Sequence, residues 1–178
     1  MNRSLIKLYS LVLIVILFIC NTGNTDAQSL KQSINSLKGV SKAGVIVEKV
    51  NQVLNDNGIN EDTILKDAVE KLDSAGMTVV DKSAMHSLPG APYLYINIGA
   101  IKSKIADVYA ASLTIEFRQD VNLSRNPKQE YFGAATWSST DVGIFSADKL
   151  KEIRLYAREI VDKFIKDYIK ANKMKEFK

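Results

Sequence analysis

The single histidine of the chain, His86, is the first residue to consider for catalysis, because it stands between Ser83 and Ser87. A serine nucleophile needs a general base beside it and a third group that orients the base. The sequence shows only proximity along the chain, and a capped turn before Pro89 explains the same spacing. We therefore expect His86 to lie in a surface turn without a catalytic role.

Carboxylates form the second candidate group, with Glu116, Asp120 and Glu130 close together in sequence. Glycoside hydrolysis needs two carboxyl groups that face each other across a cleft. Glu116 instead alternates with Arg118 on one side of a predicted strand, where a cross-strand ion pair is the commoner arrangement. The sequence contains neither the acidic spacing of a calcium loop nor a glycine-rich phosphate loop. We thus predict no catalytic residue, no metal site and no cofactor.

Aromatic side chains are the third group, and they suggest binding rather than catalysis. Tyr93 and Tyr95 share one face of a predicted strand, and Tyr131 and Trp137 share a face of a later strand. Aromatic residues are enriched at the energetic centres of protein interfaces. These four residues are our candidate partner-binding residues. The alternative is that both faces of the sheet are partly covered and that the rings are packing residues.

The C-terminus carries the one clear charge asymmetry, because residues 163–178 hold six lysines against Asp167 and Glu176. Lysines next to an anionic bilayer each contribute about 1 kcal/mol of attraction. The candidates for contact with an anionic membrane surface are Lys166, Lys170, Lys173, Lys175 and Lys178. The alternative is a solvated helix end whose lysines complement the helix dipole. Nucleic acid is not an expected partner for an exported chain.

The N-terminus predicts export. Residues 1–7 are basic, and the 13-residue run from Leu8 to Cys20 is almost purely apolar, shorter than the roughly 20 residues that span a bilayer. Thr25 and Ala27 provide small side chains for a signal peptidase, so we expect cleavage after Ala27 and a periplasmic or secreted protein. The bulky Ile19 before Cys20 argues against lipid anchoring, which leaves a mature chain without cysteine.

The remaining chain has the composition of one folded domain, with 46% hydrophobic and 25% charged residues over the 178. We divide it into a signal peptide (1–27), a mobile leader (28–42), one α+β domain (43–172) and a basic tail (173–178). Strands are expected at 44–50, 77–81, 93–101, 108–121 and 131–139, with helices after Asn60 and after Ser146. The order β-α-β-β-β-β-α predicts a two-layer sandwich, in which a mixed sheet contains a three-strand antiparallel meander and packs on two main helices.

Six segments carry a resemblance to known envelope domains: GVIVEKV, LDSAG before TVVD, PYLYINIGA, SLTIEFRQDVNL, GAATWS and DKFIKDYI. In their order they resemble the N-terminal domain of TolB and the LpoB and CsgG group of bacterial lipoproteins, and also uncharacterised secreted bacterial proteins. The resemblance implies protein docking in the cell envelope and no catalysis. It assigns no site residue, because no motif matches at residue level, and the β-propeller of TolB has no counterpart here.

Three functions remain open at this point. The first is an exported, non-enzymatic protein-interaction module of the bacterial envelope, which docks to an unidentified envelope protein. The second is a carrier that binds a small molecule or lipid in a pocket between the sheet and the last helix. The third is a hydrolase.

Overall fold

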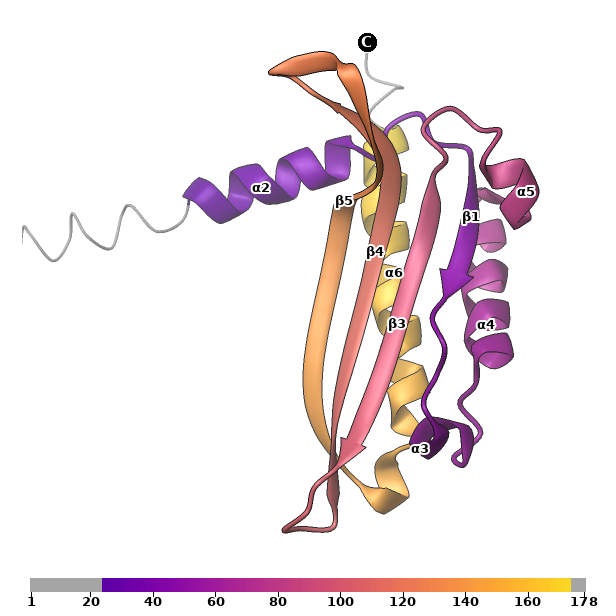
Figure 1. Ribbon diagram of the computed structural model, residues 1–178, viewed down its shortest axis with the longest axis vertical. Coiled ribbons are helices and arrows are strands. Elements are labelled where there is room, and N and C mark those ends of the chain that lie inside the picture. The colour runs from indigo at the N-terminus through magenta and orange to yellow at the C-terminus, as the bar shows by residue number, and fades with distance from the viewer. Residues whose placement is uncertain (1–23, 174–178) are drawn as a thin grey trace, which may run out of the picture.

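Five strands form one mixed sheet in the computed structural model, which describes residues 24–173 (Figure 1). Their order across the sheet is β2-β1-β3-β4-β5. The strands are β1 (Lys42–Val47), β2 (Thr78–Val79), β3 (Tyr93–Lys102), β4 (Val108–Leu123) and β5 (Asn126–Ser146). The helices are α2 (Asn24–Asn35), α3 (Gln52–Asn55), α4 (Glu61–Ser74), α5 (Lys82–Met85), the 3-10 turn η1 (Ala147–Lys149) and α6 (Glu152–Lys173).

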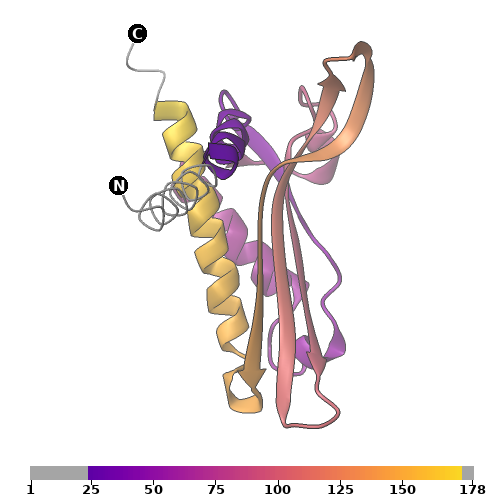
Figure 2. The same cartoon turned by 90° about the vertical axis from the view of Figure 1, so that its left-hand side faces the viewer.

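The sheet combines two kinds of pairing, as the sequence predicts. Strands β3, β4 and β5 pair antiparallel and form the expected meander, whereas β1 pairs parallel with both β2 and β3. Helices α4 and α6 lie on the same side of the sheet (Figure 2). The prediction of a two-layer α+β sandwich is therefore confirmed.

Two strands differ in length from the prediction. β2 contains only two residues, and β5 continues from the expected end at Ser139 to Ser146. Asp141 lies beyond the expected end of this strand, but it is paired opposite Leu113 in the β4–β5 register. The strand continues because residues after Asp141 keep the alternation of a sheet, with Phe145 buried between exposed neighbours.

The segment 28–42, expected to be a mobile leader, is largely helical and contributes to the core. It contains most of α2, and both Ile34 and Leu37 are buried. The backbone N–H of Gly39 donates to Asn172 on α6 at 2.9 Å, which ties the end of this segment to the last helix. The expected cleavage site after Ala27 falls within α2, and the apolar run 8–20 lies outside the described residues.

Helix α4 begins and ends where the sequence predicts. The side chain of Asn60 accepts a hydrogen bond from the backbone of Thr63 at 2.9 Å, and the Thr63 hydroxyl accepts one from the Asn60 backbone at 3.2 Å. This reciprocal capping box satisfies two N–H groups at the helix start. Gly76 follows the helix with a φ of +83°, a conformation that glycine adopts without strain.

The core lies between the sheet and α6. Phe164 stacks on Phe117 of β4 with ring centroids 5.2 Å apart and meets the edge of Trp137 of β5 at 5.1 Å. The indole N–H of Trp137 donates to Asp167 at 2.9 Å. One apolar face of α6 is buried throughout; it consists of Ile153, Ala157, Ile160, Phe164 and Tyr168, together with Leu150 just before the helix.

The substitution Phe164→Ala should lower the free energy of unfolding by about 3–5 kcal/mol, because it leaves a cavity against two aromatic rings. Urea unfolding followed by Trp137 fluorescence measures this loss directly. The control on the same helix is Leu155→Ala, whose side chain is 58% exposed, and it should change stability by no more than about 0.5 kcal/mol. Equal losses in the two variants would contradict this account of the core.

Candidate functional site

The outer face of the sheet, on the side away from α4 and α6, is the first candidate site. Alternation along β3 and β4 sends Leu94, Ile96 and Ile98 inward, so their neighbours point outward. The cross-strand register then sets the outward residues in rows, which are Tyr93 with Arg118, Tyr95 with Glu116 and Ser138, Asn97 with Thr114 and Thr140, Gly99 with Ser112 and Val142, and Ile101 with Ala110 and Ile144.

One end of this outer face is aromatic and charged, and its groups satisfy one another. The guanidinium of Arg118 lies 4.0 Å from the ring centroid of Tyr95, and its Nε and Nη2 atoms donate to the Glu116 carboxylate at 2.7 and 2.6 Å. The expected ion pair of Glu116 therefore exists, but within β4 rather than across strands. Burial and the nearby Glu48 carboxylate raise the pKa of Tyr95, so its phenol stays neutral at physiological pH.

The opposite end of the outer face is apolar and uncovered. Ile101, Val142 and Ile144 are 75%, 76% and 77% exposed, and Ala110 lies between Ile101 and Ile144. We call these four residues the apolar patch. They are neighbours across three strands, and no helix of the described residues covers them (Figures 1 and 2).

The apolar patch was not predicted. Its sequence signal is the pair Val142 and Ile144, two apolar residues two positions apart, which in a strand lie on the face opposite to Phe145. Because we ended that strand at Ser139, the spacing was not interpreted.

The four candidate aromatic residues do not form one surface. Tyr93 and Tyr95 face outward and are half-buried, as predicted, whereas Trp137 is buried on the inner face against α6. Tyr131 lies further along the β4–β5 hairpin, beside the exposed Phe132. Tyr131 and Trp137 are an even number of residues apart, which in a regular strand would place both side chains on one face. Register shifts between Phe117 and Leu123 interrupt the regular alternation of side chains, so this inference fails here.

The remaining predicted residues are dispersed. His86 is exposed and ends the short helix α5, and Ser83 donates to Asp81 rather than to the histidine. Asp120 accepts the backbone N–H of Gly133 at 2.9 Å, and Glu130 is exposed on the hairpin. No group of three or more His, Cys, Asp or Glu side chains that could hold a metal ion occurs among residues 24–173.

The C-terminal lysines are only partly within the described chain. Lys166 and Lys170 are exposed on α6, one turn apart, and Lys173 is the last residue of that helix. Lys175 and Lys178 lie outside the described residues, so contact with an anionic surface stays a prediction. None of the described helices is long and apolar enough to cross a bilayer.

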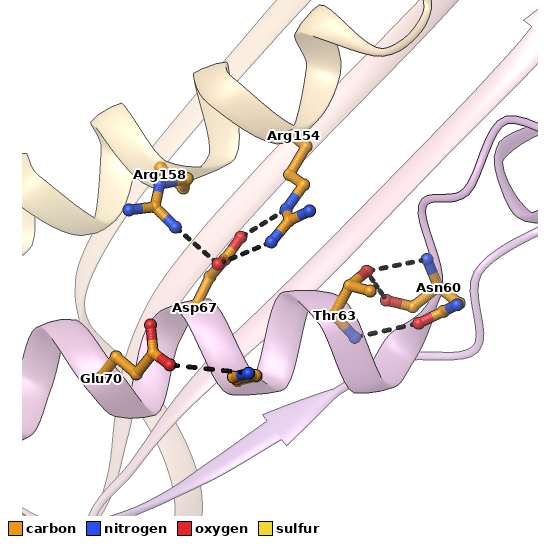
Figure 3. Close-up of polar contacts among 7 residues, drawn as sticks. Asn60, Thr63, Asp67, Glu70, Arg154 and Arg158 are labelled. Carbon is orange, nitrogen blue, oxygen red and sulfur yellow. Dashed lines mark hydrogen bonds and ion pairs between the residues drawn. The ribbon is translucent and has the colours of Figure 1, made fainter.

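A second cluster lies between the helices and was not predicted. Asp67 on α4 is 6% exposed and binds two arginines of α6: Arg154 donates through Nε at 2.7 Å and Nη2 at 2.9 Å, and Arg158 through Nη1 at 2.5 Å (Figure 3). Hydrogen bonding by Arg154 and the charges of both arginines hold the pKa of Asp67 below its usual value against the opposing effect of burial. The sequence did contain a signal for this cluster. Asp67 is an acid on the apolar face of a predicted helix, three residues after Ile64 and next to Ala68.

The space between the sheet and α6 is filled. The cavity that Ile64, Ile96, Ala157 and Val161 help to line there measures about 10 Å³, enough for about one water molecule. This packing offers no room for the carried ligand that the second sequence-based hypothesis requires at this place.

Comparison with known proteins gives a weak likeness in fold alone. No family model and no curated protein matches the sequence. Among solved structures, a variant of the PelC dodecamer from Paraburkholderia phytofirmans is 15% identical with a TM-score of 0.42, over 74% of this chain and 89% of that chain. A second PelC dodecamer structure from the same organism is 16% identical with a TM-score of 0.41, over 73% and 87%.

A minor lipoprotein from Acinetobacter baumannii is 10% identical with a TM-score of 0.35, over 71% of this chain and 91% of that chain. The names of these three structures do not include TolB, LpoB or CsgG, and that resemblance therefore stays a prediction. At this level of likeness nothing about the function of the chain follows.

The buried acid between the helices predicts a pH-dependent contribution to stability. Because the pKa of Asp67 is lowered in the folded protein, its ion pairs stabilise the fold above the unfolded pKa of about 3.9 and are lost as pH falls through the lower folded value. Asp67→Asn should cost about 2 kcal/mol at pH 7, since the two half-exposed arginines that remain reach water. The deficit should shrink below about pH 4.

Chemical unfolding at pH 7 and at pH 3 tests this dependence. Glu70→Gln on the same helix is the control, because Glu70 is an exposed partner of Lys66 and its loss should change stability by about 0.5 kcal/mol or less. A deficit in Asp67→Asn that is the same at both pH values would show that packing, not charge, is what Asp67 provides.

Proposed function

We propose that the chain is an exported, non-enzymatic protein-interaction module of the bacterial cell envelope, and that it docks to a protein partner through the outer face of its sheet. The observation that carries this proposal is the apolar patch. Ile101, Val142 and Ile144 lie beside one another and are 75–77% exposed. Covering apolar surface contributes about 25 cal/mol for each Å² removed from water, which favours a partner at this place.

The edge of the sheet adds a second means of recognition. β5 is the last strand in the sheet order, and its outer edge pairs with no other strand of the described chain. Such an edge can accept an added strand through backbone hydrogen bonds, while side chains on the adjoining face give specificity. Val142 and Ile144 belong to this edge strand, and the patch and the edge therefore form one continuous surface.

The arrangement of the polar residues supports a binding role over a hydrolytic one. Glu116 is engaged by Arg118, and Asp120 holds the backbone of Gly133. Neither carboxylate faces a second one across a cleft, which is the arrangement that glycoside hydrolysis uses. Export is supported by the basic start and the apolar run 8–20 of the sequence.

A double substitution, Val142→Lys with Ile144→Lys, tests the docking face. Both side chains are exposed, so the free energy of unfolding should change by no more than about 0.5 kcal/mol. Partner capture should fall at least about tenfold, because two buried ammonium groups would have no counter-charge in an apolar contact. The measurement is chemical crosslinking in the envelope followed by purification of the chain and mass spectrometry of the attached proteins.

The control is Lys166→Gln with Lys170→Gln, which changes the net charge by the same two units at exposed positions of α6. This variant should keep the attached protein that the patch variant loses. If both variants keep it, or if both lose it equally, the outer face is not the docking surface.

A further inference from the structure

A groove at the start of α6 has the side chains of an anion site. It lies between α6 and the loop that joins α3 to α4, and its volume is about 600 Å³, in the range of small-molecule sites. It is on the helical side of the sheet, away from the outer face, and so does not depend on the docking proposal. Its lining residues are Asn57, Gly58, Ile59, Lys151, Arg154, Leu155 and Arg158.

Three of the seven lining residues are cations and none is an acid. Arg154 and Arg158 are four residues apart and so lie on one side of α6, and Lys151 directly precedes that helix. Of the acids near the groove, Asp67 binds Arg154 and Arg158, the charge of Glu70 also acts on Arg154, and Glu152 pairs with Lys149 at 3.7 Å. Three cations against Asp67 and Glu70 leave the groove with a net positive charge.

Asp67 orients the two guanidinium groups and leaves part of each free. It accepts from Nε and Nη2 of Arg154 and from Nη1 of Arg158 (Figure 3). The Nη1 atom of Arg154, the Nε and Nη2 atoms of Arg158 and the ammonium of Lys151 make no hydrogen bond or ion pair with a residue of the described chain. With one carboxylate against three cations, the cluster has a net charge of +2.

The loop between α3 and α4 forms the other side of the groove. Gly58 has a φ of +75°, and a Cβ atom built there would meet nothing within 4 Å. Ile59 and Leu155 add apolar surface beside the cations. The groove thus offers charged donors on one side and space with an apolar border on the other.

We propose that this groove binds the phosphate group of a phosphorylated ligand. Two guanidinium forks and an ammonium match the several oxygens and the double negative charge of a phosphate monoester. A carboxylate has a single negative charge and two oxygens, so it leaves a net positive charge in the cluster. The source of the phosphate is either a free phosphorylated compound or a lipid headgroup.

Isothermal titration calorimetry with inorganic phosphate on the exported protein tests the site. We expect saturable binding, and a loss of at least about tenfold in affinity in Lys151→Gln. Lys151 has no ion pair among the described residues, so this variant should fold normally. Arg158→Gln should lose a similar factor, and Lys82→Gln, which changes an exposed lysine of α5 outside the groove, should bind as the unchanged protein does.

Acetate and vesicles complete the test. Acetate at equal ionic strength should not compete with phosphate, and equal competition by acetate would overturn the assignment to phosphate. Flotation with vesicles that contain phosphatidic acid, whose headgroup is a phosphate monoester, compared with phosphatidylcholine vesicles, identifies the lipid source if Lys151→Gln abolishes it. Absence of both phosphate binding and Lys151-dependent flotation, or equal losses in Lys82→Gln, would overturn the proposal.

Discussion

The contact of Phe164 with Phe117 and Trp137 is the interaction on which the rest of the fold depends. It fixes α6 against β4 and β5, the two longest strands, and the bond from Trp137 to Asp167 fixes the helix in the same place. Further along α6, Asn172 holds the segment after α2 through the backbone of Gly39. Nearer the start of α6, Arg154 and Arg158 bind α4. One helix therefore joins the sheet, α2 and α4.

Because the helices form a single layer, the second face of the sheet is exposed to water. The two ends of that face differ in how their side chains are paired. At one end, Arg118 stacks on Tyr95 and pairs with Glu116, so charge and aromatic surface are satisfied within the chain. At the other end, Ile101 and Ile144 are mostly exposed to solvent. This difference is the physical reason for assigning recognition to the apolar end, although the sequence directed attention to the tyrosines.

The predicted order of strands and helices sufficed to predict the two layers, because a sheet and helices that each have one apolar face must bury these faces against one another. The caps of α4 followed from local chemistry. Trp137 was assigned to the wrong face of the sheet. Side chains alternate between the two faces only where the strand register is unbroken, and the register shifts after Phe117 cannot be inferred from residue types. The Asp67 cluster was missed because Asp67 and Arg154 are 87 positions apart in sequence. Only the packing of α4 on α6 brings them into contact.

Photocrosslinking inside the cell tests the central claim most directly. A photoreactive amino acid is placed at Val142, at Ile101 or, as a control, at Lys166, and the exported chain is irradiated in the intact envelope. The account predicts a discrete protein adduct at Val142 and at Ile101, and none of that adduct at Lys166. Adducts that are absent at both patch positions, or equally abundant at Lys166, would contradict the claim that the outer face of the sheet is the docking surface.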